Sequence, residues 1–290
     1  MADSTTVVQK MTVLVQELNT VYESREAQNI AKILLEDLFG IKFPQDELKV
    51  FPSALDHDFD LAKKRLLSKE PVQYVCEKAY FYGIPFYVNP AVLIPRPETE
   101  ELVYEALQIL KKQHTPPSGL KVIDVGTGSG CIPSILKKEM PKLDVQAIDV
   151  SEEAIAVAQK NASTIGVGVE FKHLDFLDQQ AWMELTQYHM ILSNPPYIPR
   201  SEARLVPENV QRYEPDIALF VSNEDPLIFY RLLREFAKGH LLSKGWILLE
   251  INQYAAAAVL DLYKNDSAFQ EAEILQDLSG NERILRAQKC

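Results

Sequence analysis

From about residue 95 to the C-terminus, short apolar segments alternate with segments of helical periodicity, and this alternation constrains the fold most strongly. The apolar segments predict strands at residues 120–125, 145–148, 169–172, 189–192 and 246–251. The intervening segments predict helices at residues 131–139, 152–161, 226–237 and 254–264. Strands and helices that alternate in this order are typical of an α/β, Rossmann-like domain with a mostly parallel sheet.

The chain before residue 95 has a different pattern. Between residues 6 and 75, apolar residues recur at spacings of three and four, which predicts a small bundle of helices. Residues 80–88 are aromatic and β-branched and contain Gly83 and Pro85, a pattern that favours a β-hairpin. We therefore expect a helical domain at residues 1–78, a hairpin linker at 79–95 and the α/β domain at 96–290.

Composition and charge exclude several classes of protein. Three cysteines, distant from one another, and five scattered histidines disfavour a disulfide framework and a metal site. We find neither a basic and apolar leader at the N-terminus nor an apolar stretch of membrane-spanning length, and expect a cytoplasmic protein with no membrane partner. The net charge of −11 disfavours nucleic acid as a direct partner, because phosphate binding needs a basic face.

A glycine-rich loop joins the first predicted strand of the α/β domain to its helix. Its residues are Gly126, Thr127, Gly128, Ser129 and Gly130. Glycines allow a sharp turn and let a ligand approach the backbone. The dinucleotide fingerprint would place a third glycine at Cys131, whereas this Gly-x-Gly-x-Gly pattern resembles the cofactor loop of S-adenosylmethionine methyltransferases. The alternative is a tight turn without a ligand.

Acidic and aromatic residues follow the next two strands. Asp149 lies 23 residues after Gly126, where a carboxylate can accept hydrogen bonds from both hydroxyls of a ribose. It could instead cap the following helix, although Ser151 is better placed for that role. Asp175 and Phe176 end the following strand, where they could contact an adenine base or be ordinary loop residues.

The segment Asn194-Pro195-Pro196-Tyr197 follows a further apolar strand. The two prolines restrict the backbone and lack N–H groups, so the turn offers hydrogen-bond acceptors. The Asn194 side-chain oxygen and the Pro195 carbonyl could bind both hydrogens of a planar amine or amide nitrogen and direct its lone pair at a methyl donor. Tyr197 could stack on the flat face of the substrate group. These four residues are the candidate catalytic residues.

This motif alone leaves alternatives open. Asn-Pro-Pro is a common turn in proteins of any function. Adenine, cytosine and glutamine all present a nitrogen of this kind, so a nucleic-acid methyltransferase acting on adenine N6 is the alternative enzyme. A protein that binds S-adenosylmethionine without catalysis is a third hypothesis.

The full set of motifs resembles the release-factor glutamine-N5 methyltransferase family over nearly the whole chain. Outside the glycine loop and the Asn-Pro-Pro-Tyr turn, the resemblance is carried by residues 70–74, 81–83, 92–100, 213–219 and 280–283. Two of these segments, at Arg96-Pro97-Glu98 and Asn281-Glu282-Arg283, also fit a helix start and a turn between two closing strands. Phe176 and Cys131 depart from the tryptophan or leucine and the alanine that are usual at these positions.

The resemblance implies a methyltransferase that modifies the glutamine of the Gly-Gly-Gln loop in a class I peptide-chain release factor, a protein of translation termination. The cofactor would be S-adenosylmethionine, and the product S-adenosylhomocysteine. The glycine loop, Asp149, Phe176 and Asn194 would hold the cofactor, and residues 194–197 the glutamine. Asp175 is a further candidate cofactor residue because of its position at the strand end. The helical domain would help to bind the release factor. Separately from the resemblance, we expect the enzyme to act as a monomer.

Overall fold

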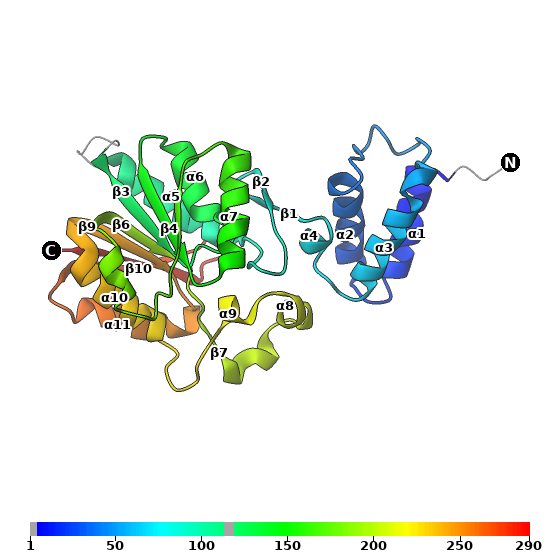
Figure 1. Cartoon of the computed structure of the whole chain (residues 1–290). Helices are drawn as coiled ribbons and strands as arrows, with labels where there is room; N and C mark the ends of the chain where they lie inside the picture. The colour runs from blue at the N-terminus through cyan, green and yellow to red at the C-terminus, as the bar shows by residue number, and fades with distance from the viewer. Residues whose placement is uncertain (1–4, 113–118) are drawn as a thin grey trace. The chain divides into compact units, whose positions relative to one another are not determined.

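A computed structural model describes residues 5–112 and 119–290 (Figure 1). The chain divides into two compact units. The first contains Met1–Lys78 together with Glu208–Tyr213, and the second contains Ala79–Pro207 and Glu214–Cys290.

The first unit is helical, as the sequence predicts. Its main helices are α1 (Val7–Leu18), α2 (Ser24–Asp37), α3 (Asp56–Leu67) and the short α4 (Val72–Val75). Leucines that recur at helical spacing, Leu14, Leu18 and Leu34 among them, are fully buried between the helices. Helix α1 begins with a capping box, in which the Thr6 hydroxyl accepts from the amide of Gln9 and Gln9 accepts from the amide of Thr6.

Helix α8 (Glu208–Tyr213) belongs to the helical unit although it lies far along the chain. Lys69 forms an ion pair of 2.9 Å with Glu208, and the Tyr213 hydroxyl donates to the carbonyl of Ser68 at 2.7 Å. In the sequence, helix α8 lies within residues 96–290, the range expected for the α/β domain. Single polar contacts of this kind leave no periodic signal in the sequence.

The second unit is built on a seven-stranded sheet with the strand order β10-β11-β9-β6-β3-β4-β5. The parallel strands are β3 (Lys121–Val125), β4 (Asp144–Asp149), β5 (Glu170–His173), β6 (Tyr188–Ser193) and β9 (Leu241–Glu250). The antiparallel strands β10 (Phe269–Gln276) and β11 (Glu282–Lys289) continue the sheet beyond β9. The mostly parallel sheet predicted from the sequence is confirmed.

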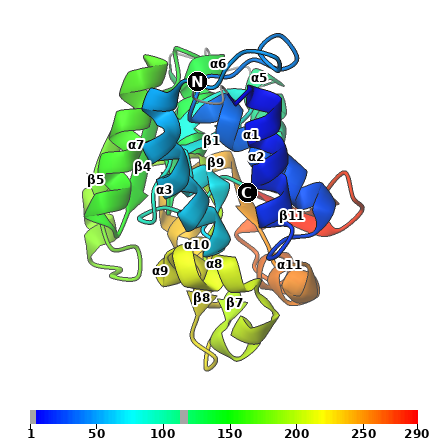
Figure 2. The same cartoon turned by 90° about the vertical axis from the view of Figure 1, so that its right-hand side faces the viewer.

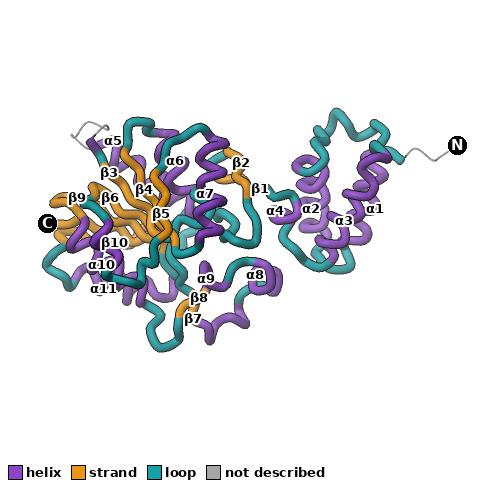
Figure 3. The backbone as a smooth tube through the Cα atoms, viewed as in Figure 1, coloured by secondary structure: helices purple, strands orange, loops and turns teal. Residues whose placement is uncertain are grey.

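Helices cover both faces of this sheet (Figures 1 and 3). One face carries α5 (Pro97–Lys112), α6 (Cys131–Glu139) and α7 (Glu152–Ile165), and the other carries α10 (Ile228–His240) and α11 (Ala256–Lys264). Alternate residues along each strand point to opposite faces of the sheet. Val122 and Met190 pack towards α5 and α6, whereas Ile123 and Ile191 pack towards α10. The strand sequences are continuous apolar runs because both faces of the sheet are buried.

The predicted hairpin is present as β1 (Lys78–Phe81) and β2 (Ile84–Tyr87). It packs into the second unit, because Phe81 and Phe86 are buried in the core beside α5 and α6. The Asn161 side chain on α7 fastens the hairpin to the glycine loop. Its amide nitrogen donates to the carbonyls of Tyr87 and Ser129, both at 2.9 Å, and its oxygen accepts from the amide of Tyr87 at 2.7 Å.

The segment between β6 and α10 forms short elements that the sequence left unassigned. These are β7 (Ile198–Pro199), α9 (Asp216–Leu219) and β8 (Phe220–Val221), and β7 pairs with β8 in parallel. Figure 2 shows the three elements grouped together. Elements of two to four residues are too short to produce a hydrophobic period.

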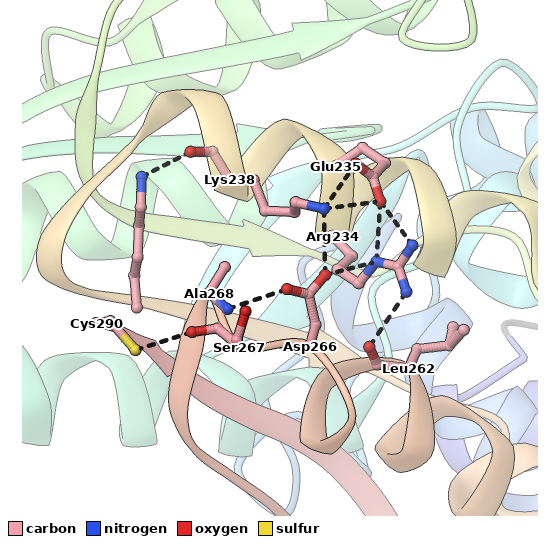
Figure 4. Close-up of polar contacts among 9 residues, drawn as sticks. Arg234, Glu235, Lys238, Leu262, Asp266, Ser267, Ala268 and Cys290 are labelled. Atoms are coloured by element: carbon pink, nitrogen blue, oxygen red, sulfur yellow. Dashed lines mark hydrogen bonds and ion pairs between the residues drawn. The ribbon is translucent and has the colours of Figure 1, made fainter.

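Polar contacts fasten the end of the chain to α10 and to the loop after α11 (Figure 4). The Asp266 carboxylate forms ion pairs with Lys238 at 3.2 Å and Arg234 at 3.6 Å. The Cys290 thiol donates to the carbonyl of Ser267 at 3.3 Å. These contacts lie at the end of the sheet opposite the carboxyl ends of the parallel strands.

We predict that Asn161→Ala lowers the free energy of unfolding by about 2–4 kcal/mol, because it leaves a buried amide and two carbonyls without partners. Chemical denaturation measures the effect. Ser163→Ala, on the exposed face of the same helix, is the control and should change stability by less than about 0.5 kcal/mol. A loss below about 1 kcal/mol for Asn161→Ala would show that the hairpin is held by other contacts.

Candidate active site

A pocket lies where β3, β4 and β6 end, at the carboxyl edge of the sheet. All of its lining residues belong to the second unit. Open α/β sheets bind ligands at this edge. Ten of the twelve residues that the sequence singled out line the pocket: Gly126, Thr127, Gly128, Ser129, Asp149, Asp175, Phe176, Asn194, Pro195 and Pro196. Gly130 and Tyr197 do not line it.

The glycine loop presents its backbone to the pocket. Gly126 and Gly128 have φ angles of +76° and +53°, which side chains other than glycine rarely adopt. A Cβ built on either glycine would meet no atom within 4 Å, so both positions open onto free space. The amides of Gly126 and Thr127 donate to the carbonyl of Ile148, which holds the loop against the end of β4. The loop is therefore a backbone cradle with room for a ligand.

Gly130 has a packing role in this structure. Its φ angle is +75°, and an added Cβ would lie 2.8 Å from the Cβ of Ala158 on α7. A contact this short cannot be accommodated without moving the helix. The third glycine of the loop thus permits close approach of α6 and α7, whereas the first two face the pocket.

Asp149 is the last residue of β4 and is largely buried. One carboxylate oxygen accepts from the amide of Gly128 at 2.8 Å, and the other accepts from the amide of Ser151 at 3.0 Å. Burial raises the pKa of this carboxyl, while the backbone donors act in the opposite direction. Ser151 is the helix cap, since its hydroxyl accepts from the amide of Ala154. Each oxygen of Asp149 retains a lone pair for a hydroxyl of a ligand.

Asp175 and Phe176 lie on the loop after β5 and line the same pocket. The Phe176 ring stacks on Trp182 with centroids 5.2 Å apart and meets Phe236 edge to face. The Asp175 side chain accepts from the amide of Leu177, which closes a local turn. Phe176 is thereby a rigid apolar wall of the pocket.

Asp124 is a fully buried acid beneath the glycine loop. Neither of its carboxylate oxygens has a hydrogen-bond partner among the described residues, and the buried hydroxyl of Thr127 also lacks one. Burial raises the pKa of Asp124 to about 7, the nearby Thr127 hydroxyl acts in the opposite direction, and the negative charge of Asp149 raises the pKa further. Unpartnered buried carboxylates are uncommon and are expected where a cationic ligand compensates them.

The Asn194-Pro195-Pro196-Tyr197 turn begins directly after β6. The first three residues line the pocket. The Tyr197 ring is largely buried and packs against the α10 side of the core, where its hydroxyl donates to Glu250 at 3.5 Å. Burial raises the pKa of this phenol. Tyr197 therefore packs against the core and does not line the pocket.

The Asn194 side chain is held by Thr99, which lies in the segment 92–100 that carried the family resemblance but was not a candidate site residue. Its amide nitrogen donates to the Thr99 hydroxyl at 3.1 Å, and that hydroxyl donates to Glu250 at 2.6 Å. Among the described residues, the Asn194 side-chain oxygen has no donor. An acceptor therefore remains available at the pocket wall.

An ion pair between the partly exposed Arg96 and the buried Glu214 lies at another side of the pocket. Arg96 lines the pocket and donates to Glu214 at 2.6 Å, and Glu214 also accepts from the amide of Ile94 at 3.1 Å. Both charged residues lie in segments that carried the family resemblance, which was the available signal for them. Pro97 begins helix α5, as the sequence indicated, and Asn281 lies in the turn between β10 and β11.

Two classes of feature are missing from the part of the chain that the structure describes. None of its helices is both long and apolar enough to cross a membrane. Within the same residues, no three histidine, cysteine or acidic side chains gather as metal ligands would.

The site combines a backbone cradle, acids at two strand ends and a turn of acceptors. Such a site can bind a nucleoside with a cationic group and orient a planar nitrogen beside it.

Comparison with known families matches this arrangement. The family model described as "Methyltransferase small domain" matches residues 103–215, which include the glycine loop, Asp149 and the Asn-Pro-Pro-Tyr turn.

Several relatives are similar over most of the chain. The chain is 37% identical to the release factor glutamine methyltransferase of Flavobacterium psychrophilum over 95% of this chain and 96% of that protein. It is 34% identical to the protein of the same name from Bacteroides thetaiotaomicron, over 94% of this chain and 97% of that protein. For the Bacillus subtilis protein, identity is 39% over 75% of each chain.

Solved structures show the same fold at low identity. The hMettl16 catalytic domain, in complex with the MAT2A 3′UTR hairpin 1, superposes with a TM-score of 0.55 at 13% identity, over 90% of this chain and 89% of that one. A methyltransferase from Pyrococcus furiosus has a TM-score of 0.50 at 14% identity, over 81% of this chain and 98% of that one. These similarities concern the fold alone.

We predict that Asp124→Asn makes the unliganded protein more stable at pH 8 by about 1–3 kcal/mol, because it removes a buried, unpaired charge. The folded-state pKa is raised, so the wild-type protein binds a proton on folding and loses stability as pH rises from about 4 to about 7. The variant should show a flatter dependence on pH in denaturation experiments across this window. Equal slopes for the two proteins would contradict the prediction.

Proposed function

Because the chain belongs to the release factor glutamine methyltransferase family, we propose that it methylates the side-chain amide nitrogen of a glutamine in a peptide-chain release factor. The methyl donor is S-adenosylmethionine. We propose further that the substrate glutamine is that of the Gly-Gly-Gln loop in a class I release factor.

One observation supports the proposal above the others, namely the orientation of the Asn194 carboxamide. Its nitrogen is engaged by Thr99, so its oxygen is left as an acceptor at the pocket. A glutamine amide has two hydrogens on a planar, weakly nucleophilic nitrogen. The Asn194 oxygen and the Pro195 carbonyl would accept one hydrogen each and hold the nitrogen in place.

The pocket residues fit the cofactor. The space open in front of Gly126 and Gly128 would accept the ligand against bare backbone. Asp149 would accept from the ribose hydroxyls, and Asp175 and Phe176 would contact the adenine. The uncompensated acid at Asp124 fits a ligand that carries positive charge. When bound, S-adenosylmethionine supplies an electrophilic methyl group on a sulfonium.

The chain's own residues would act mainly by positioning. The two acceptors would align the nitrogen with the methyl group and favour its pyramidal geometry as the carbon–nitrogen bond forms and the carbon–sulfur bond breaks. The methylated nitrogen is strongly acidic, so its extra proton can leave to solvent without a dedicated base. The apolar walls formed by Phe176 and Pro196 would limit water near the reacting atoms.

We also propose the oligomeric state, the class of substrate, the cellular location and the roles of the domains. We propose that the enzyme acts as a monomer. The net charge of −11 supports a protein substrate over nucleic acid. A substrate that takes part in translation supports a cytoplasmic location. The helical domain at residues 1–78 would contact the release factor, and residues 79–95 and 96–290 would form the hairpin and the catalytic domain.

We predict that Asn194→Ala lowers kcat for release-factor methylation by about 10²–10³-fold, the usual effect of losing one preorganised hydrogen-bonding group. Mass spectrometry of the loop peptide measures methylation, and calorimetry measures cofactor binding. Cofactor affinity should fall by less than about tenfold, because the backbone cradle remains.

Two controls separate the alternatives. A release factor with Gln→Ala in the Gly-Gly-Gln loop should accept no methyl group, and equal labelling of both proteins would refute the assignment of the glutamine. DNA and RNA oligonucleotides serve as the second control. Methyl transfer to adenine, with none to the release factor, would favour the nucleic-acid alternative.

A further inference from the structure

A chain of buried hydrogen bonds reaches the Asn194 side chain from behind the pocket wall. Asn194 donates to the Thr99 hydroxyl at 3.1 Å, and Thr99 donates to Glu250 at 2.6 Å. Thr99 and Glu250 are only 3% and 2% exposed. Neither residue is part of the Asn-Pro-Pro-Tyr motif, and they come from α5 and β9 respectively.

Strand pairing explains why Glu250 lies beside Asn194. Ser193 at the end of β6 lies opposite Leu249 on β9. The next residues are Asn194, directly after β6, and Glu250, the last residue of β9. Helix α5 begins at Pro97, and Thr99 lies in its first turn. The Thr99 hydroxyl thus bridges the two strand ends.

The direction of the hydrogen bonds follows from the number of hydrogens. A threonine hydroxyl has one hydrogen, and a carboxylate has none. Ionised Glu250 therefore takes the Thr99 hydrogen, and Thr99 can only accept from Asn194. This accepting hydroxyl selects the nitrogen of the Asn194 carboxamide and leaves its oxygen towards the pocket.

We propose that Thr99 and Glu250 are positioning residues that determine which end of the Asn194 carboxamide faces the substrate. The proposal rests on the proposed function, in which the Asn194 oxygen accepts a hydrogen of the glutamine amide. If Glu250 is protonated, its hydrogen can be donated to Thr99. The Thr99 hydroxyl is then free to donate to the Asn194 oxygen, which turns the amide nitrogen towards the pocket, where it repels a substrate N–H.

Charged and titratable groups surround Glu250 on several elements. Burial raises the pKa of Glu250 to about 7, the Thr99 hydrogen bond and the positive charge of Arg283 on β11 lower it, and the negative charge of Glu98 raises it. The Tyr197 hydroxyl donates to its other oxygen. The hydroxyl of Tyr230 on α10 donates to its backbone carbonyl at 3.4 Å. Together these influences leave the pKa of the Glu250 carboxyl well above the ordinary value of a glutamate.

The first test compares two substitutions at Thr99. Thr99→Val keeps the shape but removes the hydroxyl, and kcat should fall by about ten- to a hundredfold with less change in KM for the cofactor. Thr99→Ser restores a hydroxyl and should recover kcat to within about threefold. Thr164→Val on the exposed face of α7 is the matched control and should behave as wild type. Equal kcat for the valine and serine variants would overturn the proposal.

The second test uses Glu250→Gln and the dependence of kcat on pH. Only ionised Glu250 enforces the productive orientation, so wild-type kcat should rise with pH through about 7. Glutamine can donate or accept towards Thr99, so the variant should be slower at pH 8 and should lack this rise. Asp124 also has a pKa raised to about 7, and the rise should persist in Asp124→Asn. A rise retained in Glu250→Gln would exclude Glu250 as its source.

A third measurement separates this proposal from the proposed function, because it needs no substrate. Nuclear magnetic resonance of the Asn194 side-chain amide should show a pH-dependent shift in the wild-type protein that disappears in Glu250→Gln and Thr99→Val. If this signal behaves as expected but no release factor is methylated, the proposed function fails and the positioning of Asn194 stands. If the signal is the same in all three proteins, the positioning proposal fails whatever the activity.

Discussion

The parallel pairing of β6 with β3 on one side and with β9 on the other is the constraint on which the site depends. Because neighbouring strands run in one direction, their last residues meet at one edge, and each strand delivers a different group there. Strand β3 leads into the glycine loop, β6 into Asn194 and β9 ends at Glu250. A change of register between β6 and β9 by one residue would separate Asn194 from Glu250 and turn the side chains to the opposite face.

Two buried carboxylates near the site, Asp124 and Glu250, differ in their hydrogen bonding. Asp124 has no partner among the described residues, whereas Glu250 has hydrogen bonds from Thr99 and Tyr197. Burial raises the pKa of each to about 7, so keeping either charged at higher pH is unfavourable for the folded state. Such groups are retained where a ligand or a substrate uses their charge. In our proposals, the charge of Asp124 attracts the cationic cofactor from behind the pocket wall, and that of Glu250 orients Asn194.

Much of the site could be predicted from local sequence. The residues that could not be predicted have one physical reason in common. Glycines before a helix, an acid at the next strand end and an Asn-Pro-Pro turn are contiguous patterns, and their residues line the pocket. Thr99 and Glu250 are single polar residues in a helix and a strand, 151 positions apart, and no period or spacing relates them. Tyr197 belongs to the motif, but the direction of its ring depends on the space beside α10, which sequence does not reveal.

By itself, the sequence determined the order of strands and helices, the positions of the turns and the chemistry that the turns can offer. These properties are local, because period, proline and glycine act on the few residues around them. Only the tertiary structure decided that Gly130 packs on Ala158 instead of facing the pocket, that α8 joins the helical unit, and that Thr99 holds the nitrogen of Asn194. Each of these depends on contacts between segments distant along the chain, which exist only once the sheet has assembled.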